Sequence, residues 1–262
     1  MIISLQNKKA LITASSKGIG FAIASLFAQL GAQVAICSRS PEAVQNAVDQ
    51  LKSKTVLPIL TFHGDLGSRS FIESMSQTLL EEWGGVDILV NNNGGPKPGT
   101  LFEGTEEDWE QALQATLMSS IRLIRHLAPA MKERKWGRII NLTSSTAKEP
   151  EPTLTMSNVT RAGVMTFGKT AATELGPFGI TVNTILTGRV MTDRLESIMK
   201  LNAERQGMTY DQMVEKTEKM IPIGSISSTE EFAKTIAFLA SDHSGYLNGT
   251  AFALDGGAMK SV

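Results

Sequence analysis

Short apolar runs alternate with longer amphipathic stretches along almost the whole chain, and this alternation constrains the fold more than any other feature of the sequence. Seven apolar runs have the length of a strand, at residues 8–14, 33–39, 56–65, 86–95, 137–145, 179–188 and 250–257. The stretches between them carry apolar residues at helical spacing, as at Val44, Ala47 and Leu51. Strands separated by helices form a parallel sheet that is covered on both faces. The sequence therefore predicts an α/β fold.

Capping residues predict where several of the helices begin. Ser40 stands before Pro41, a pair that favours an N-cap followed by the first helical position. Thr105 with Asp108 resembles a capping box and predicts a long helix that continues through Met131. Further helices are expected over residues 18–31, 71–80 and 158–175, and after a Ser228–Glu231 cap.

No linker or repeat divides the 262 residues, so we expect a single domain over 1–262. One segment, at about 189–220, inserts two charged amphipathic stretches between a strand and the next regular helix. Insertions after the carboxyl end of a strand often form lids or substrate walls, so we expect a helical substrate lid here. Its many methionines suit core packing or, alternatively, an adaptable apolar wall.

The charge balance excludes several classes of partner. Lys plus Arg (25) nearly equal Asp plus Glu (26), which disfavours nucleic acid and anionic membranes as partners. Neither a signal-like segment nor an apolar run of membrane-spanning length is found, so a cytoplasmic protein is expected. Cys37 lies in an apolar run and predicts a buried core residue. The three histidines are scattered along the chain, and no metal site is expected.

A glycine-containing turn follows the first predicted strand and opens the first predicted helix. It has the sequence T-A-S-S-K-G-I-G, residues 13–20. Glycines allow close approach of the backbone, and the helix N-terminus offers free N–H groups to the diphosphate of a dinucleotide. The predicted cofactor contacts in this turn are Thr13, Ser15, Ser16, Lys17, Gly18, Ile19 and Gly20.

The end of the second predicted strand indicates which dinucleotide is preferred. An acidic residue here would bind a free ribose 2′-hydroxyl, but the chain has Ser38 and Arg39. An arginine instead pairs with a 2′-phosphate through charge-assisted hydrogen bonds, and Lys17 adds a second positive charge. These residues favour NADP(H) over NAD(H). The alternative is that Arg39 is only a solvated residue at a strand end.

Five motifs occur in a fixed order along the chain: the turn at 13–20, Asp65-Leu66, N-N-N-G at 91–94, N-T-I-L-T-G-R-V-M-T at 183–192 and D-G-G at 255–257. In these motifs the chain resembles the short-chain dehydrogenase/reductase family over essentially its whole length. The nearest likeness is to bacterial 3-oxoacyl-carrier-protein reductases and to related sugar or alcohol dehydrogenases.

The resemblance implies a single Rossmann-like, doubly wound parallel sheet of about seven strands flanked by helices. It also implies a homo-oligomer, a tetramer or a dimer, with helices near 109–131 and 158–175 at the interface, and a small-molecule carbonyl or alcohol as substrate. The further cofactor contacts that it implies are Asp65, Leu66, Asn91, Asn93, Gly94, Arg161, Gly188, Val190 and Thr192.

The chain departs from the family pattern at three positions near the cofactor. Ala14, Asn93 and Thr187 stand where the family has glycine, alanine and proline. None of these replacements by itself forbids nucleotide binding, although Ala14 tightens the phosphate turn.

The larger departure concerns the catalytic tetrad of asparagine, serine, tyrosine and lysine. These positions fall on Thr116, Ser144, Ser157 and Arg161, so only the serine is retained. The register is anchored by G-R-I-I-N-L-T-S before the tetrad serine and by R-A-G-V at residues 161–164. A tyrosine can therefore not be recovered by sliding the alignment.

These replacements change how a proton can reach the substrate oxygen. A serine hydroxyl is a far weaker acid than a tyrosine whose pKa is lowered by lysine. Arg161 can still bind ribose hydroxyls and stabilise an oxyanion, and water held by Ser157 and Arg161 is the most economical proton source. The alternatives are Glu149 or Glu151, if buried, and Tyr210, if the insert closes over the site.

The sequence leaves three functions open. The preferred hypothesis is an NADP(H)-dependent oxidoreductase, similar to 3-oxoacyl reductases, with an atypical active site. The second is a catalytically silent dinucleotide-binding module that acts as a sensor or structural partner. The third is a different reaction, such as an elimination, on a bound nucleotide or polar ligand. Function depends on the site rather than the fold, so the fold cannot decide among them.

Overall fold

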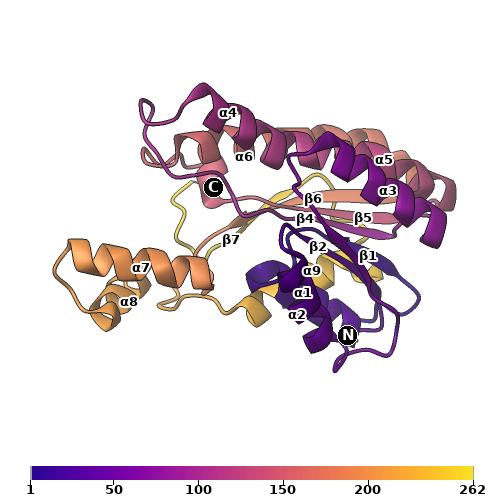
Figure 1. The fold of residues 1–262 in the computed structure, drawn as a ribbon, viewed down its shortest axis with the longest axis horizontal. Coiled ribbons are helices and arrows are strands. Elements are labelled where there is room, and N and C mark those ends of the chain that lie inside the picture. The colour runs from indigo at the N-terminus through magenta and orange to yellow at the C-terminus, as the bar shows by residue number, and fades with distance from the viewer. Residues whose placement is uncertain (1, 262) are drawn as a thin grey trace.

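Parallel strands form one sheet in the order β3-β2-β1-β4-β5-β6-β7 in the computed structural model, which describes residues 2–261 (Figure 1). The strands are β1 (Lys9–Ile12), β2 (Gln33–Ser38), β3 (Leu60–His63), β4 (Ile88–Asn91), β5 (Gly137–Leu142), β6 (Ile180–Thr187) and β7 (Ala251–Leu254). The sheet winds outward in both directions from β1 and β4, so the crevice between these two strands is the topological switch point. The predicted doubly wound sheet is confirmed.

Helices cover both faces of the sheet (Figure 1). On one face lie α1 (Gly18–Gln29), α2 (Pro41–Leu51) and α9 (Thr229–Ala240); on the other lie α3 (Arg69–Trp83), α5 (Ser119–Arg134) and α6 (Thr155–Leu175). Successive strand residues point to opposite faces, so Leu11 and Ile12 belong to different hydrophobic cores. The inner strands β1, β2, β4, β5 and β6 are buried along nearly their whole length, whereas the edge strands β3 and β7 are only partly buried.

The predicted caps are present at the helix starts. Ser40 Oγ accepts a hydrogen bond from the backbone N–H of Ala43 at 3.2 Å. Thr105 and Asp108 form a reciprocal capping box at the start of α4 (Glu106–Ala112). A further predicted cap is also formed, because the backbone N–H of Glu231 donates to the side chain at position 228.

The long helix expected from residue 105 through 131 is interrupted. A π-helical segment, Leu113–Met118, separates α4 from α5. Carbonyl groups in this segment are bound by side chains, since Ser119 Oγ donates to Ala115 O at 2.7 Å. Such π segments are frequent at functional sites, and this one contains Thr116.

The insert at about 189–220 folds into two helices, α7 (Asp193–Arg205) and α8 (Tyr210–Glu218), which project from one end of the sheet (Figure 1). They enclose a small core of Met199, Ala203 and Met213, distinct from the two sheet cores. Backbone hydrogen bonds between Ser227 and residues 189 and 191 join the two ends of the insert. Its buried methionines therefore pack the insert itself.

Cys37 is buried, as predicted, and burial raises the pKa of its thiol to about 12. Within residues 2–261, every helix is too short or too polar to cross a membrane.

Candidate active site

The glycine turn lies at the carboxyl end of β1 and is tightly folded. A Cβ atom at Gly20 would stand 2.5 Å from the carbonyl oxygen of Ala14, so only glycine fits there. The residue before α1, Lys17, makes no side-chain cap, and the first turn of α1 contains no acidic residue. The first amide groups of α1 are therefore available to an anion, which fits the diphosphate of a dinucleotide.

The opposite side of the crevice is formed by the end of β4. Thr13 Oγ1 donates to Asn92 O at 2.6 Å and accepts from the Asn92 amide at 2.7 Å, while Asn92 Nδ2 donates to Ala14 O at 3.1 Å. A Cβ atom at Gly94 would meet no atom within 4 Å, so the crevice is open beside this residue. Asn92 was not among the residues predicted from the sequence.

The end of β2 presents hydroxyl and cationic groups to the glycine turn. Ser16 Oγ donates to Ser38 Oγ at 3.0 Å. Lys17 and Arg39 are exposed, and among residues 2–261 neither forms an ion pair with a carboxylate. Asp65 stands at the end of β3, where one carboxylate oxygen accepts from the Gly67 amide at 2.8 Å. These positions suit an adenosine ribose and its 2′-substituent.

Some predicted cofactor contacts face the protein interior. Ser15 Oγ donates to Ile12 O and accepts from the Cys37 amide, so it joins β1 to β2. Asn91 Nδ2 donates to Asn141 Oδ1 at 2.8 Å within the sheet. The side chains of Ile19, Leu66 and Val190 pack against the hydrophobic cores.

Helix α6 begins at Thr155, earlier than the expected start near residue 158. Ser157 and Arg161 consequently lie one helical turn apart on the same face. Arg161 Nε donates to Ser157 Oγ at 3.1 Å. The hydroxyl hydrogen of Ser157 therefore remains available to another acceptor.

Asn93 holds Arg161 from the opposite side. Arg161 Nη2 donates to Asn93 Oδ1 at 3.4 Å, and Asn93 Nδ2 donates to Ala115 O in the π-helical segment at 3.2 Å. Arg161 Nη1 also donates to Leu142 O at the end of β5, at 3.5 Å. Burial, and then the positive charge of Arg194, lowers the pKa of Arg161 to about 10. Arg161 is therefore still charged at neutral pH.

Ser144 and Thr116 lie on the two elements that flank this pair. Ser144 follows β5, and its Oγ accepts from the Thr146 amide at 3.2 Å. Thr116 is buried in the π-helical segment, where its carbonyl oxygen accepts from Ser120 Oγ at 3.1 Å. The structure thus brings the tetrad positions to the carboxyl ends of β4 and β5.

The alternative proton donors have partners or surroundings that do not suit this role. Glu149 Oε1 accepts from the backbone amides of Lys260 and Ser261 at 2.6 and 2.5 Å. The Ser261 amide is the main cause that lowers the pKa of Glu149, whereas a proton donor needs a raised pKa. Glu151 accepts from Thr153 Oγ1 at 3.4 Å in an exposed loop, so it lacks the burial that its role required. Tyr210 packs against the core of the insert.

Arg194 was missed by the sequence reasoning. It is the second residue of α7, and its Nη2 donates to Pro96 O at 3.4 Å across the crevice. The only sequence signal was that the insert begins with charged residues.

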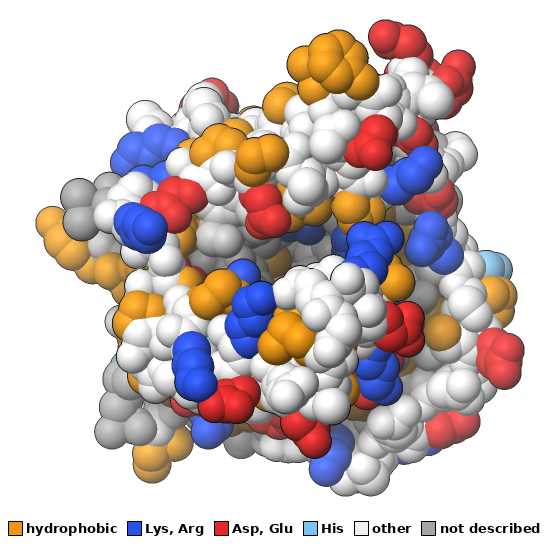
Figure 2. Space-filling view, turned by 90° about the vertical axis from the view of Figure 1, so that its left-hand side faces the viewer, with side chains coloured by type: hydrophobic (Ala, Val, Ile, Leu, Met, Phe, Trp, Pro, Cys, Tyr) orange, Lys and Arg blue, Asp and Glu red, His pale blue; other side chains and the backbone are white. Residues whose placement is uncertain are grey.

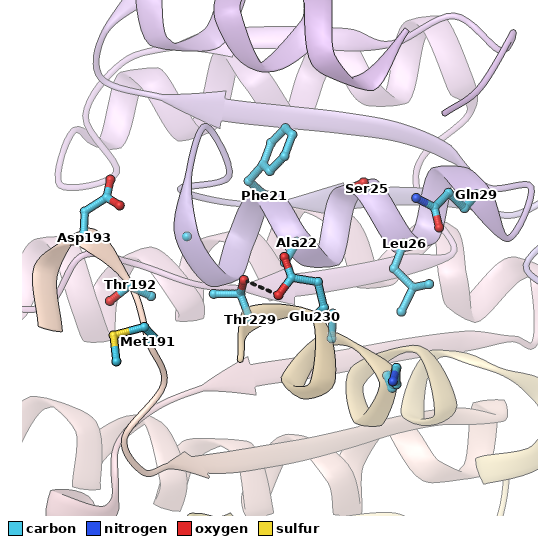
Figure 3. A pocket seen from close by; sticks show the side chains of 13 residues that line it. Phe21, Ala22, Ser25, Leu26, Gln29, Met191, Thr192, Asp193, Thr229 and Glu230 are labelled. Carbon is cyan, nitrogen blue, oxygen red and sulfur yellow. Dashed lines mark hydrogen bonds between the residues drawn. The ribbon is translucent and has the colours of Figure 1, made fainter. Parts of the chain in front are cut away.

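A hollow of about 390 Å³ lies beside the glycine turn, between α1, α9 and the start of α7 (Figure 3). Gly18 and Thr192 border it, and Thr192 Oγ1 caps α7 by accepting from the Leu195 amide at 3.3 Å. Its lining includes neither Ser157 nor Arg161, so it adjoins the cofactor end rather than the reacting end. Gly188 follows β6, and a Cβ atom there would stand 2.5 Å from Asp255, so this position is tightly packed.

Residues 2–261 contain no group of three or more His, Cys, Asp or Glu side chains placed to hold a metal ion.

Three comparisons with known proteins agree with this geometry. The family model described as Enoyl-(Acyl carrier protein) reductase matches residues 13–259. The chain is 32% identical over 253 residues to the 3-oxoacyl-[acyl-carrier-protein] reductase FabG of Chlamydia trachomatis, covering 97% of this chain and 98% of that protein. It is 31% identical over 252 residues to D-beta-hydroxybutyrate dehydrogenase of Rhizobium meliloti, covering 95% and 98%.

A solved structure extends the likeness to the whole fold. The L-sorbose reductase of Gluconobacter frateurii, solved in complex with NADPH and L-sorbose, superposes with a TM-score of 0.95 at 33% identity and covers 100% of both chains. The Rossmann-like sheet, the glycine turn and the matches over nearly the full length lead to one conclusion: the chain belongs to the short-chain dehydrogenase/reductase family of oxidoreductases.

Proposed function

We propose that this chain is an NADP(H)-dependent oxidoreductase that interconverts a carbonyl group and an alcohol, in the manner of 3-oxoacyl reductases, with an active site built on Ser144, Ser157 and Arg161. One observation carries the proposal. The replacement at position 161 is matched by that at position 93, because Asn93 Oδ1 accepts from the Arg161 guanidinium. An alanine, the family residue at position 93, has no side-chain acceptor for it.

This pairing supports an adapted site rather than a decayed one. Loss of function would leave the replacements at the tetrad unrelated to one another. Here Arg161 is held by Ser157, Asn93 and the carbonyl group of Leu142, so its guanidinium has a defined position. A preorganised positive charge is what a developing oxyanion requires.

The cofactor end supports NADP(H). The amide groups at the start of α1 would bind the diphosphate, and Lys17 with Arg39 would bind a 2′-phosphate. Arg161 would donate to the ribose hydroxyls next to the nicotinamide. The bound nicotinamide would supply or accept the hydride. The Gluconobacter L-sorbose reductase complexed with NADPH provides a precedent in a structure of the same fold.

The side chains at the reacting end would stabilise the alkoxide oxygen. Ser144 and Ser157 each have a hydroxyl hydrogen to donate to it, and Arg161 supplies a positive charge. The Ser157 hydroxyl is too weak an acid to replace tyrosine, so water supplies the proton that the alkoxide takes up. General acid–base catalysis contributes about 10²–10⁴-fold, so a slow enzyme is the expected result.

A homo-oligomer, a tetramer or a dimer, would bury the outer faces of α5 and α6. Val159 in α6 exposes 52% of its surface in the single chain, which supports an interface on this side. Sedimentation of the purified protein measures the number of subunits directly.

The test is NADPH consumption against ketones, 3-oxoesters and sugars, for the natural chain and for the triple variant Asn93→Ala/Ser157→Tyr/Arg161→Lys. The variant has the family residues at these three positions and serves as the control that scaffold and substrate suit each other. Turnover by the natural chain supports the proposal. If only the variant turns over while both bind NADPH, the natural chain is the silent dinucleotide-binding module instead.

Cofactor preference is tested separately. The ratio of NADH to NADPH dissociation constants is measured for the natural chain, for Arg39→Ala and for the control Arg205→Ala, at the far end of α7. We expect the ratio to fall about tenfold or more for Arg39→Ala only, since a charge-assisted hydrogen bond is lost. An unchanged ratio contradicts the assignment of Arg39 to the 2′-phosphate.

A further inference from the structure

Two arginine side chains from distant parts of the chain meet over Gly95. A Cβ atom at Gly95 would stand 2.8 Å from Arg161 Nη2 and 3.4 Å from Arg194 Nη1. Both guanidinium groups therefore border the same small space beside the β4 loop. One belongs to the sheet domain, through α6, and the other to the insert, through α7.

Within the described part of the chain, neither arginine has a negatively charged partner. Among residues 2–261, no carboxylate lies within 4.0 Å of Arg161 or Arg194, whereas the nearby Lys97 pairs with Asp108 at 3.7 Å. The contacts of the two guanidinium groups are with neutral acceptors: Ser157 Oγ, Asn93 Oδ1 and backbone carbonyl groups. Two like charges thus face each other without compensation.

The position of each arginine is unfavourable in the absence of an anion. Arg161 is partly buried, and burial of an unpaired charge is costly. Arg194 lies in the first turn of α7, where the helix dipole disfavours a cation. Figure 2 shows several Lys and Arg side chains around a recess on one face of the molecule. An anion between the two guanidinium groups would relieve all of these effects.

The location of the two arginines indicates whether the anion belongs to the cofactor or to the substrate. The cofactor diphosphate is accounted for by the amide groups at the start of α1, which are uncapped. Arg161 is instead bonded to Ser157 and Asn93, where the substrate oxygen is expected, and Arg194 approaches Arg161 over Gly95. An anion bound here would therefore lie close to the reacting carbon, where a group of the substrate is expected.

We infer that the substrate is an oxo acid or hydroxy acid whose carboxylate is held between Arg161 and Arg194. This inference rests on the proposed function and names the substrate class of the same site. A planar carboxylate matches the guanidinium fork, and two such forks bind it more selectively than one. The same carboxylate would link the insert, through Arg194, to α6, through Arg161.

The first experiment compares an acid with its uncharged ester. The kcat/KM for NADPH-dependent reduction is measured for 3-oxobutanoate, 2-oxobutanoate and their methyl esters, with the natural chain, Arg194→Gln and Arg205→Gln. The last variant removes the same charge at the far end of the same helix. We expect the natural chain and Arg205→Gln to prefer the acids, and Arg194→Gln to lose about 10- to 100-fold of that preference. Equal loss for acid and ester overturns the inference.

A second experiment does not depend on turnover. Calorimetry with saturating NADPH measures the binding of butanoate and of butanamide, neither of which carries a reducible carbonyl group of the required kind. We expect butanoate to bind the natural chain and to bind Arg194→Gln at least tenfold more weakly, while butanamide binds both equally. NADPH affinity is measured in parallel, because its loss in Arg194→Gln assigns the two arginines to the cofactor and overturns the inference.

The two experiments separate the inference from the proposed function. Butanoate binding that depends on Arg194, without reduction of any substrate, supports the anion site and contradicts the oxidoreductase. Reduction of esters in preference to acids supports the oxidoreductase and overturns the carboxylate site. Inorganic phosphate that binds more tightly than butanoate, with the same dependence on Arg194, overturns the choice of a carboxylate.

Discussion

Ala14 occupies a backbone conformation that favours glycine. Its φ is +46°, in the left-handed region, where a Cβ atom costs about 1–2 kcal/mol. Glycine relieves this strain but loses about 0.5–1 kcal/mol through the greater freedom of the unfolded chain. We therefore expect Ala14→Gly to raise the free energy of unfolding by about 0.5–1 kcal/mol in urea titrations.

A matched control for this change is Lys135→Gly, because Lys135 has φ +53° at the end of α5, away from the crevice. Both variants are expected to gain stability, and only Ala14→Gly is expected to alter NADPH affinity. A loss of stability in Ala14→Gly alone would show that the methyl group of Ala14 contributes more by packing than it costs by strain.

The surroundings of residue 161 also explain why an arginine stands here in place of the family's lysine. Burial and the neighbouring Arg194 lower the pKa of Arg161 to about 10, which leaves it charged at neutral pH. The ordinary pKa of a lysine is about 10.4, so the same causes would lower the pKa of a lysine at this position toward 7. Its charged form is lost as pH rises through this lowered pKa. We expect the kcat/KM of Arg161→Lys to decline at lower pH than that of the natural chain.

The pH profiles from 6 to about 9 test this prediction, with NADPH affinity as a second readout. Arg161→Lys combined with Arg194→Gln removes one of the two causes and is expected to move the decline back to higher pH. Identical profiles for the natural chain and Arg161→Lys would mean that charge at this position does not limit the reaction.

At the residue scale, the sequence predicts the identity of the tetrad positions but not their partners. The contact between Ser157 and Arg161 can be predicted locally, since the two residues are one helical turn apart. The contact of Asn93 with Arg161 joins residues far apart in the sequence, as does the meeting of Arg161 with Arg194. Such contacts depend on how α6 and α7 pack, which periodicity does not encode.

At the element scale, strands and caps were predictable because they depend on neighbouring residues. Ser40 and the Thr105–Asp108 box bind amides within their own first turn. The π-helical segment Leu113–Met118 was not predictable, since its carbonyl groups are satisfied partly by Asn93 from another element. The earlier start of α6 likewise depends on tertiary contacts rather than on a cap, because the residue before it makes none.

The insert has a hydrophobic core of its own, so it can unfold locally while the sheet stays folded. Met213 is buried against α7, with 5% of its surface exposed, and the sheet cores do not include it. We expect Met213→Ala to speed hydrogen exchange over residues 193–218 while the midpoint of global unfolding changes little, since the lost packing is local. Exchange measured by mass spectrometry resolves this segment.

The control is Met75→Ala in the sheet core, where Met75 exposes 1% of its surface. Removal of a buried methionine side chain from such a core costs about 2–5 kcal/mol, so its global midpoint is expected to fall. If Met213→Ala lowers the global midpoint as much, the insert unfolds together with the sheet and is not a separable lid.

At the scale of the whole molecule, the crevice is where the two halves of the sheet meet. β1 and β4 are joined by three pairs of aligned residues, and beyond them by the bonds between Thr13 and Asn92. The cofactor would bind across this junction, from the glycine turn on one side to Gly94 on the other. Cofactor binding and the cohesion of the sheet would therefore be coupled.

This coupling predicts the effect of Thr13→Val, which keeps the shape of the side chain and removes its hydroxyl. The Asn92 amide loses its acceptor at 2.7 Å, and a polar group left unpaired in a buried site costs about 1–3 kcal/mol. We expect a loss of unfolding free energy of this size together with weaker NADPH binding. Thr170→Val is the control, because Thr170 is exposed on α6 and donates only to Thr166 O of its own helix.

Thermal unfolding with and without NADPH measures both effects on the same samples. A ligand present at 100 times its dissociation constant stabilises the folded state by about 2.7 kcal/mol. Because the two halves of the crevice are less firmly joined in Thr13→Val, the same NADPH concentration is expected to stabilise this variant less than the natural chain or Thr170→Val. If NADPH stabilises the natural chain, Thr13→Val and Thr170→Val equally, NADPH binding does not depend on the bonds between Thr13 and Asn92.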